Sequence, residues 1–145
     1  MKAEKFKHIF TGLDRVHGEY RYSETKLNGK RDGKMFTKHE PPTLQMYLDH
    51  LDGKMPALGI VPIRDDATCT WGCIDIDEYP LDHKKILSKI REYELPLIMC
   101  SSKSFGAHIF LFSKTPQSAA IFQQKLKEIA SYIGYANTEV FPKQT

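Results

Sequence analysis

The order of the expected strands and helices predicts an α+β fold with two layers, in which helices cover one face of an antiparallel sheet. Three observations support this fold class. The chain has 145 residues, about the length of one domain with a sizeable core. Hydrophobic residues make up 41% and charged residues 27%, which fits neither a disordered chain nor a membrane protein. From residue 70 onward the patterns follow the order βαββαβ, which is that of the ferredoxin-like fold.

Membrane and secretion signals are absent from the sequence. No apolar run approaches the roughly 20 residues of a membrane-spanning helix, and residues 1–10 are too charged for a signal peptide. Cys69, Cys73 and Cys100 are too few and odd in number for a disulfide scaffold, and no convincing fourth ligand accompanies them for zinc. We therefore expect a cytoplasmic protein without a membrane partner.

The positive charge is concentrated at the amino-terminal end. Residues 1–40 hold ten Lys or Arg and six Asp or Glu, whereas residues 41–145 hold eleven and twelve. A basic segment on a nearly neutral body suits a polyanionic partner. The stretch 26–38 is interpreted either as a solvated loop or as an arm that contacts a nucleic-acid template.

Residues 1–56 are expected to form an amino-terminal extension of the same domain, and residues 57–145 its core. In the extension, a helix over 3–10 would bury Phe6, Ile9 and Phe10. The segment 20–42 is polar and punctuated by Gly and Pro, which predicts a long loop or irregular ribbon. Thr43 is expected to cap a helix that carries Leu44, Tyr47, Leu48 and Leu51 and ends at Gly53.

The core shows clearer signals. Strands are expected at 57–63, 70–77, 97–101, 107–112 and 139–141, and helices at 82–94 and 115–133. Asp82 is a typical amino-terminal cap, and Thr115-Pro116 predicts a cap followed by proline at the first helical position. The second helix would turn Phe122, Leu126, Ile129, Ala130 and Ile133 inward.

Side-chain alternation places several polar residues on the open face of this sheet. Because Ile74 and Ile76 must face the helices, Asp75 and Asp77 share the open face, about 7 Å apart. The same argument adds His108 from the third strand and Glu139 from the fourth. Such paired carboxylates repel one another unless a cation lies between them, and an all-oxygen site suits Mg²⁺ or Mn²⁺.

Two further features accompany the acidic residues. The loop 101–106 (SSKSFG) carries three hydroxyls, one cation and a glycine, and it can present donors to phosphate oxygens. Phe110 and Phe112 also fall on the open face, where they would either stack on bases or pack beneath the amino-terminal segment.

These motifs resemble those of the archaeo-eukaryotic primase superfamily, and most closely the primase module of phage-type primase-polymerases and TOTE conflict systems. The strand CIDID (73–77) resembles its first motif, SSKSFGAHIFLF (101–112) its second, and TEVFPKQT (138–145) its third. The resemblance covers residues 58–145. It implies a domain of a bacterial or phage-infected cell that continues past residue 145 in relatives, so this chain is expected to lack a carboxy-terminal part.

The resemblance also implies residue roles. Asp75, Asp77 and Glu139 would be catalytic and hold Mg²⁺ or Mn²⁺, and the catalytic His108 would bind the triphosphate. Further nucleotide-binding residues would be Ser102, Lys103, Ser104, Lys143 and Gln144. The implied activity is a DNA primase or polymerase that joins nucleoside triphosphates on a single-stranded DNA or RNA template, with a helicase domain or subunit as a further partner. Phe105 departs from the family, because relatives often have glycine there.

Two alternatives remain open at this point. One is a non-catalytic module of the RNA-recognition type, which would favour aromatic rather than acidic residues on its first strand. The other is a metal-dependent nuclease that uses the same three carboxylates.

Overall fold

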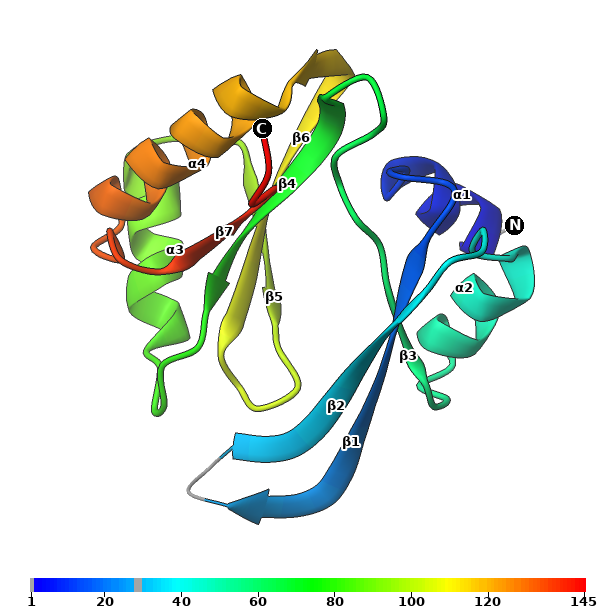
Figure 1. Cartoon of the computed structure of the whole chain (residues 1–145). Coiled ribbons are helices and arrows are strands. Elements are labelled where there is room, and N and C mark those ends of the chain that lie inside the picture. The colour runs from blue at the N-terminus through cyan, green and yellow to red at the C-terminus, as the bar shows by residue number, and fades with distance from the viewer. Residues whose placement is uncertain (1, 28–29) are drawn as a thin grey trace. The chain divides into compact units, whose positions relative to one another are not determined.

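The chain forms two compact units, Met1–Asp66 and Ala67–Thr145 (Figure 1). The computed structural model describes residues 2–27 and 30–145, except for the side chains of residues 24–31. The units divide after Asp66, whereas the boundary expected from the sequence follows residue 56. No helix in the described ranges has both the length and the apolar character needed to cross a bilayer.

The first unit combines two helices with a small antiparallel sheet. Its elements are α1 (Lys2–Ile9), β1 (His17–Leu27), β2 (Lys30–Lys38), α2 (Leu44–Leu51) and β3 (Ala57–Gly59). The strand order is β2-β1-β3. Phe6 of α1 packs with its ring centroid 6.2 Å from that of Tyr47 in α2, and Tyr47 is buried. The predicted burial of Ile9 is wrong, because α1 turns this side chain outward and leaves it 47% exposed.

Two local predictions in this unit have opposite outcomes. Thr43 caps α2 as expected, since its hydroxyl accepts a hydrogen bond from the backbone amide of Met46. The segment 20–42, expected as a loop or irregular ribbon, instead contributes most of a regular hairpin of β1 and β2. The register of this hairpin shifts only between Tyr22 and Lys26. Cross-strand pairing therefore outweighs the polar composition that predicted a loop.

The second unit has the predicted βαββαβ order. Its elements are β4 (Thr68–Ile76), α3 (His83–Glu92), β5 (Leu97–Ser101), β6 (Ala107–Ser118), α4 (Ala119–Tyr132) and β7 (Glu139–Phe141). The strand order is β5-β6-β4-β7, so β4 and β6 are central and β7 lies beside β4. Figure 1 shows α3 and α4 on one face of this sheet. The α+β fold class is confirmed.

The core of the second unit lies between that sheet and its helices. Asp82 caps α3 by accepting a hydrogen bond from the amide of Lys85. The residues of α4 predicted to face inward, Phe122, Leu126, Ile129, Ala130 and the adjoining Ile133, are all buried. Gly134 ends this helix with a φ of +92°, a conformation that favours glycine.

The start of α4 differs from the prediction. Thr115 and Pro116 belong to β6, and Ser118 is the residue that precedes the helix. The pairing of β4 with β6 jumps from Trp71–Phe112 to Cys69–Gln117, so Pro116 lies in an irregular stretch. A proline is tolerated there because no ladder hydrogen bond from its nitrogen is required.

Gly72 lets β4 approach both α4 and β7. A Cβ at this position would lie 2.6 Å from Cδ1 of Leu126 and 2.6 Å from the backbone oxygen of Phe141. We predict that Gly72→Ala lowers the free energy of unfolding by about 1–3 kcal/mol, because it overpacks this junction. Urea denaturation measures the change. Gly59→Ala is the matched control, since its Cβ would make only ordinary contacts, 3.4 Å or more. Equal losses in both variants would contradict the packing argument.

Candidate active site

Asp75 lies at the centre of the open sheet face. In β4 it pairs directly with His108 of β6 on one side and with Glu139 of β7 on the other. Directly paired residues on neighbouring strands project from the same face. Ile74 and Ile76, which flank Asp75, are buried on the opposite face. The structure thus brings together these three predicted residues from three neighbouring strands, as the alternation argument required.

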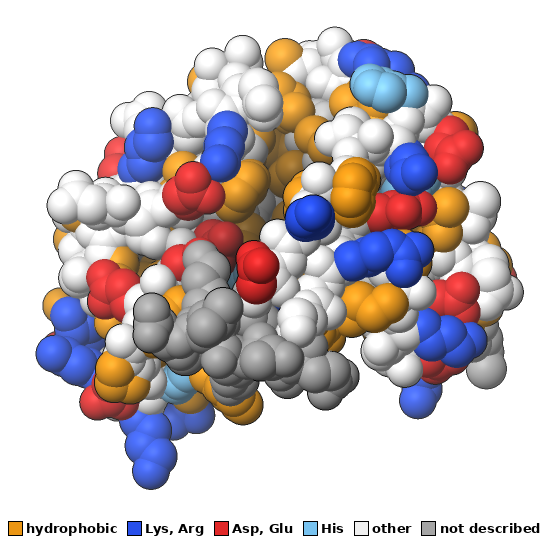
Figure 2. All heavy atoms as spheres, turned by 60° about the horizontal axis from the view of Figure 1, so that its bottom comes forward, with side chains coloured by type: hydrophobic (Ala, Val, Ile, Leu, Met, Phe, Trp, Pro, Cys, Tyr) orange, Lys and Arg blue, Asp and Glu red, His pale blue; other side chains and the backbone are white. Residues whose placement is uncertain are grey.

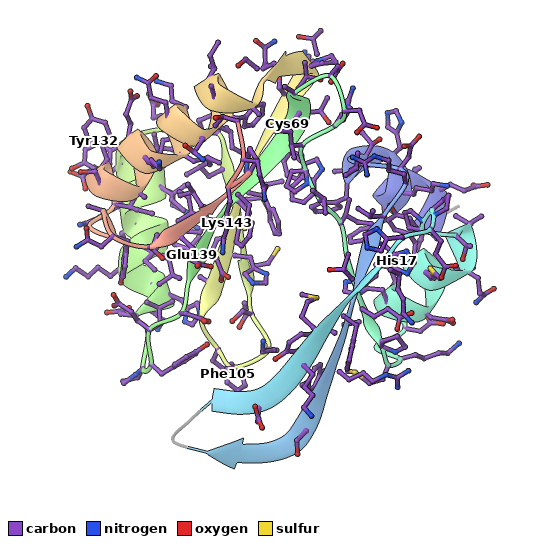
Figure 3. All side chains as sticks on the ribbon, viewed as in Figure 1. His17, Cys69, Phe105, Tyr132, Glu139 and Lys143 are labelled. Carbon is purple, nitrogen blue, oxygen red and sulfur yellow. The ribbon has the colours of Figure 1, made fainter. Side chains whose placement is uncertain are left out.

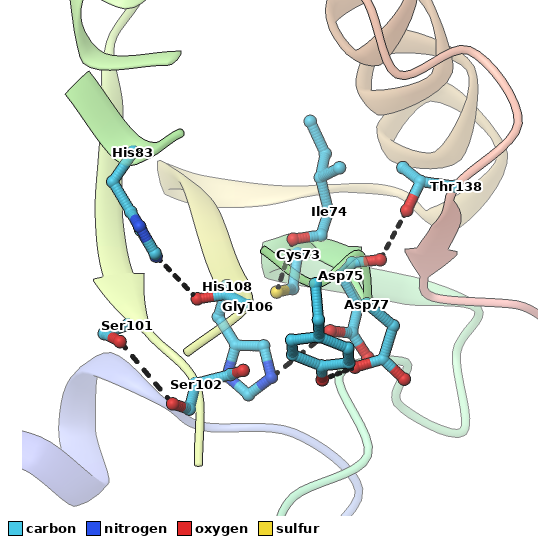
Figure 4. Close-up of polar contacts among 11 residues, drawn as sticks. Cys73, Ile74, Asp75, Asp77, His83, Ser101, Ser102, Gly106, His108 and Thr138 are labelled. Atoms are coloured by element: carbon cyan, nitrogen blue, oxygen red, sulfur yellow. Dashed lines mark hydrogen bonds and ion pairs between the residues drawn. The ribbon is translucent and has the colours of Figure 1, made fainter. Parts of the chain in front are cut away.

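The carboxylate of Asp75 faces the imidazole of His108. Its Oδ1 lies 3.3 Å from Nε2 of His108, and the two side chains are 25% and 44% exposed (Figure 4). This Oδ1 atom is buried and accepts no hydrogen bond from any described residue. The backbone oxygen of Asp75 accepts a hydrogen bond from the hydroxyl of Thr138, which anchors the chain just before β7. Asp75 is therefore fixed through its backbone while one carboxylate oxygen stays available.

Glu139 is paired with the lysine that follows β7. Nζ of Lys143 donates a hydrogen bond of 2.9 Å to Oε1 of Glu139 and lies 5.0 Å from the ring centroid of Phe141. Figure 3 shows Glu139 and Lys143 side by side. The backbone oxygens of Pro142 and Lys143 accept hydrogen bonds from the amide of Gln123 in α4. Gln144 is exposed.

Asp77 follows β4 and is exposed. Its Oδ1 accepts a hydrogen bond of 2.7 Å from the hydroxyl of Tyr79. It shares a cleft of about 350 Å³ with the other predicted metal ligands; the lining residues are Asp75, Asp77, Glu78, Gly134, Tyr135, Ala136, Asn137, Thr138 and Glu139. Sequence reasoning missed Tyr79, Glu78 and Thr138, although the first two directly follow the Asp-x-Asp motif.

The donor set of this cleft fits a divalent cation. Asp75 and Glu139 are like charges directly opposite each other on neighbouring strands, an arrangement that costs free energy without a cation. Oxygen ligands of this kind are those of Mg²⁺ and Mn²⁺. As the side chains lie, however, Lys143 and Tyr79 engage two of the three carboxylates. Over residues 2–27 and 30–145, no three His, Cys, Asp or Glu side chains meet closely enough to hold a metal ion. Binding would therefore require these carboxylates to exchange partners.

The loop between β5 and β6 is seated against the end of β4. Ser102 closes it, with its amide donating to the backbone oxygen of Gly106 and its own backbone oxygen accepting from the amide of Phe105. Gly106 permits close approach, because a Cβ there would lie 2.3 Å from the backbone oxygen of Ile76. The ring of His83 donates to the backbone oxygen of Gly106 from α3 (Figure 4).

The four predicted triphosphate ligands differ in accessibility. Lys103 is exposed and His108 is partly exposed, whereas Ser104 is only 2% exposed. Oγ of Ser102 is buried and has no hydrogen-bond partner within the described residues. Of these four residues, Lys103 and His108 present their side chains to solvent. The hydroxyl of Ser102 is buried and makes no hydrogen bond to the described residues.

An aromatic row continues from His108 along the open face. The ring centroid of Phe110 lies 6.1 Å from that of His108, 6.1 Å from that of Phe112 and 6.2 Å from that of Trp71. Cys73 lies on the same face of β4, where burial and the charge of Asp75 raise the pKa of its thiol. The row offers flat apolar surfaces next to the acidic cleft.

A βαββαβ sheet with acidic residues from its central strand and a neighbouring strand, and a histidine beside them, is the arrangement that the resemblance to primase domains predicted. A family comparison gives the particular family. Residues 4–145 match the family described as "TOTE conflict system, Archaeo-Eukaryotic Primase domain", and the chain belongs to this family. The match begins in α1, so it includes the first unit, beyond the residues 58–145 that carried the resemblance. No curated protein matches the chain significantly.

Phe105 occupies a strained position at the tip of the β5–β6 loop (Figure 3). Its φ is +65°, in the left-handed region that favours glycine, and it is 62% exposed. We predict that Phe105→Gly raises the free energy of unfolding by about 0.5–1 kcal/mol, because relief of the strain exceeds the added entropy of glycine in the unfolded chain. Phe105→Ala is the control, since it removes the ring but retains the strain. An equal gain in both variants would assign the effect to the ring.

The cysteines near the site should differ in reactivity. Burial raises the pKa of the Cys73 thiol, which lowers its thiolate fraction, whereas Cys100 is exposed. We predict that iodoacetamide at pH 8 alkylates Cys100 and leaves Cys73 and the buried Cys69 unmodified until the chain unfolds. Peptide mass spectrometry with and without urea measures this. Rapid alkylation of Cys73 in the folded protein would show that the sheet opens locally.

Proposed function

We propose that this domain is a template-dependent nucleotidyltransferase of the primase-polymerase type. The observation that carries the proposal is the position of Asp75, which is paired on its two sides with His108 and Glu139 within a primase-family fold. The reaction would join the 3′ oxygen of one nucleotide to the α-phosphorus of a nucleoside triphosphate. The hydroxyl loses its proton and pyrophosphate leaves.

Asp75, Asp77 and Glu139 would hold Mg²⁺ or Mn²⁺ in this reaction. When bound, these cations supply Lewis-acid activation of the attacking oxygen and neutralise charge on the phosphates. The buried, unused Oδ1 of Asp75 supports this assignment, as does the direct opposition of Asp75 and Glu139.

The remaining residues would bind the triphosphate. His108 faces Asp75 and presents its partly exposed ring beside the metal ligands, so it can donate to a phosphate oxygen when protonated. The exposed Lys103 adds a positive charge from the neighbouring loop, and the hydroxyl of Ser102 offers a further donor. Lys143, which is hydrogen-bonded to Glu139, and the exposed Gln144 would contact nucleotide or template.

A second candidate is a non-catalytic module that binds nucleic acid. The partly exposed rings of Phe110 and Phe112 favour it, because aromatic side chains on such a sheet stack on unpaired bases in recognition modules. The acidic cleft at the end of the aromatic row opposes it, since carboxylates repel phosphates. A metal-dependent nuclease would use the same carboxylates and differ in its product.

We predict that Asp75→Asn weakens Mn²⁺ binding at least tenfold, about 1.4 kcal/mol, and lowers primer extension by roughly 100-fold or more. Without metal, the variant should unfold at a higher temperature, because one of two opposed carboxylates is neutral. Calorimetric Mn²⁺ titration, thermal melting in chelator and extension of a primed single strand with labelled nucleotides measure these effects.

Glu92→Gln is the control for loss of one carboxylate, since Glu92 is exposed near the end of α3. It should behave like the unaltered chain in all three measurements. Unchanged Mn²⁺ affinity in Asp75→Asn would overturn the metal assignment. Shortened products would identify a nuclease, and retention of the strand without any product would identify the binding module.

A further inference from the structure

The hairpin of β1 and β2, here called the ribbon (residues 17–27 and 30–38), is positively charged. It contains six Lys or Arg and three Asp or Glu, so its surplus of three equals the formal charge of +3 of the whole chain. On the face of the molecule that Figure 2 shows, the described basic and acidic side chains are otherwise interspersed. The ribbon therefore carries a surplus of three positive charges, and α3, with four Lys or Arg and one Glu, carries the same surplus.

The strand register places like charges opposite one another in the ribbon. Arg21 pairs directly with Lys34. Such pairs destabilise a sheet unless an anion lies between them. Arg21 and Lys34 are exposed, and neither forms an ion pair with a described residue. A bound polyanion would offset the repulsion between these two side chains, so we expect the hairpin to have a polyanionic partner.

The opposite face of the ribbon is aromatic. The rings of Tyr20 and Tyr22 lie with their centroids 6.0 Å apart, and both residues are partly buried. Gly33 makes room for the first ring, because a Cβ there would lie 2.1 Å from the hydroxyl oxygen of Tyr20. Nearby Met35 is 60% exposed. The tyrosine rings support the ribbon from this face, and the opposite face presents Arg21 and Lys34, which is the basic part of a surface that binds single-stranded nucleic acid.

The ribbon also extends beyond its supporting sheet. β3 pairs only with Gly18–Tyr20 of β1, so from Arg21 onward the described pairing involves two strands alone. Figure 1 shows these two strands continuing past β3. The Arg21–Lys34 pair thus lies on the part of the ribbon that β3 does not cover.

We propose that the ribbon binds the phosphodiester backbone of single-stranded nucleic acid, with Arg21 and Lys34 as paired phosphate ligands. The proposal rests on the proposed function in that a polymerase of this type needs a template. DNA and RNA share the chemistry that the ribbon recognises, so the two are separate arms of one test.

The test measures fluorescence anisotropy of labelled 20-nucleotide single strands, DNA or RNA, with the whole chain in chelator at several salt concentrations. The double variant Arg21→Gln/Lys34→Gln should bind roughly tenfold or more weakly at 50 mM salt. Its slope of log affinity against log salt should be smaller by about 1.4, because two phosphate contacts are lost. The arm with the larger loss identifies the preferred strand.

Lys84→Gln/Arg91→Gln is the matched control, because it removes one exposed lysine and one exposed arginine from α3. It should keep the salt slope of the unaltered chain. An equal loss in both double variants would overturn the proposal in favour of general charge attraction. Binding of phosphatidylserine vesicles but not of oligonucleotides would overturn it in favour of a membrane surface.

A charge reversal separates binding from folding. Lys34→Glu places opposite charges at the Arg21 pair, so its melting temperature at low salt should rise while oligonucleotide binding falls. A fall in both the melting temperature and oligonucleotide binding would show a folding defect and count against the ribbon as the binding site.

The variant Asp75→Asn should bind single strands normally but not extend them. If the unaltered chain binds strands but does not extend them, the proposed function is overturned and the ribbon proposal is not. If Arg21→Gln/Lys34→Gln extends primers as well as the unaltered chain does, the ribbon proposal is overturned and the proposed function is not.

Discussion

The register of β4 between β6 and β7 determines the chemistry of the second unit, because it sets which side chains share a face. Asp75 meets His108 and Glu139 only in the observed pairing. A shift of one residue would turn Asp75 toward the helices and expose Ile74, which is fully buried. Packing against the helices therefore fixes the acidic site: the apolar face selects the register, and the polar face follows from it.

Each of the three predicted metal ligands in the cleft has a separate partner in the protein. Asp75 faces His108, Glu139 is held by Lys143, and Asp77 accepts from Tyr79. This arrangement limits the repulsion among three acids whose backbone positions are close. A cation bound in the cleft, as proposed, would have to compete with His108 and Lys143 for these carboxylates.

The sequence predicted the second unit well because its signals are local. The strand 97–101 and the strand 139–141 have the expected bounds, and the apolar positions of α4 face inward.

The prediction failed where pairing between distant residues decides the structure. The hairpin of β1 and β2 is polar, so it lacks the alternation that marks a half-buried strand, and Pro116 concealed the continuation of β6. The proximity of Asp75, His108 and Glu139 followed from alternation, whereas the contact of Tyr79 and the burial of Ser104 depend on loop geometry that alternation does not determine.

The close approach of Gly106 to the backbone of Ile76 separates the spacing of this site from the charge that its loop presents. Main-chain atoms set the distance between the β5–β6 loop and the end of β4, because even a Cβ at residue 106 would lie 2.3 Å from the backbone oxygen of Ile76. Replacing the exposed side chain of Lys103 would therefore change the charge of the loop without moving the loop away from the acidic strand. Residue 106 itself has no such freedom.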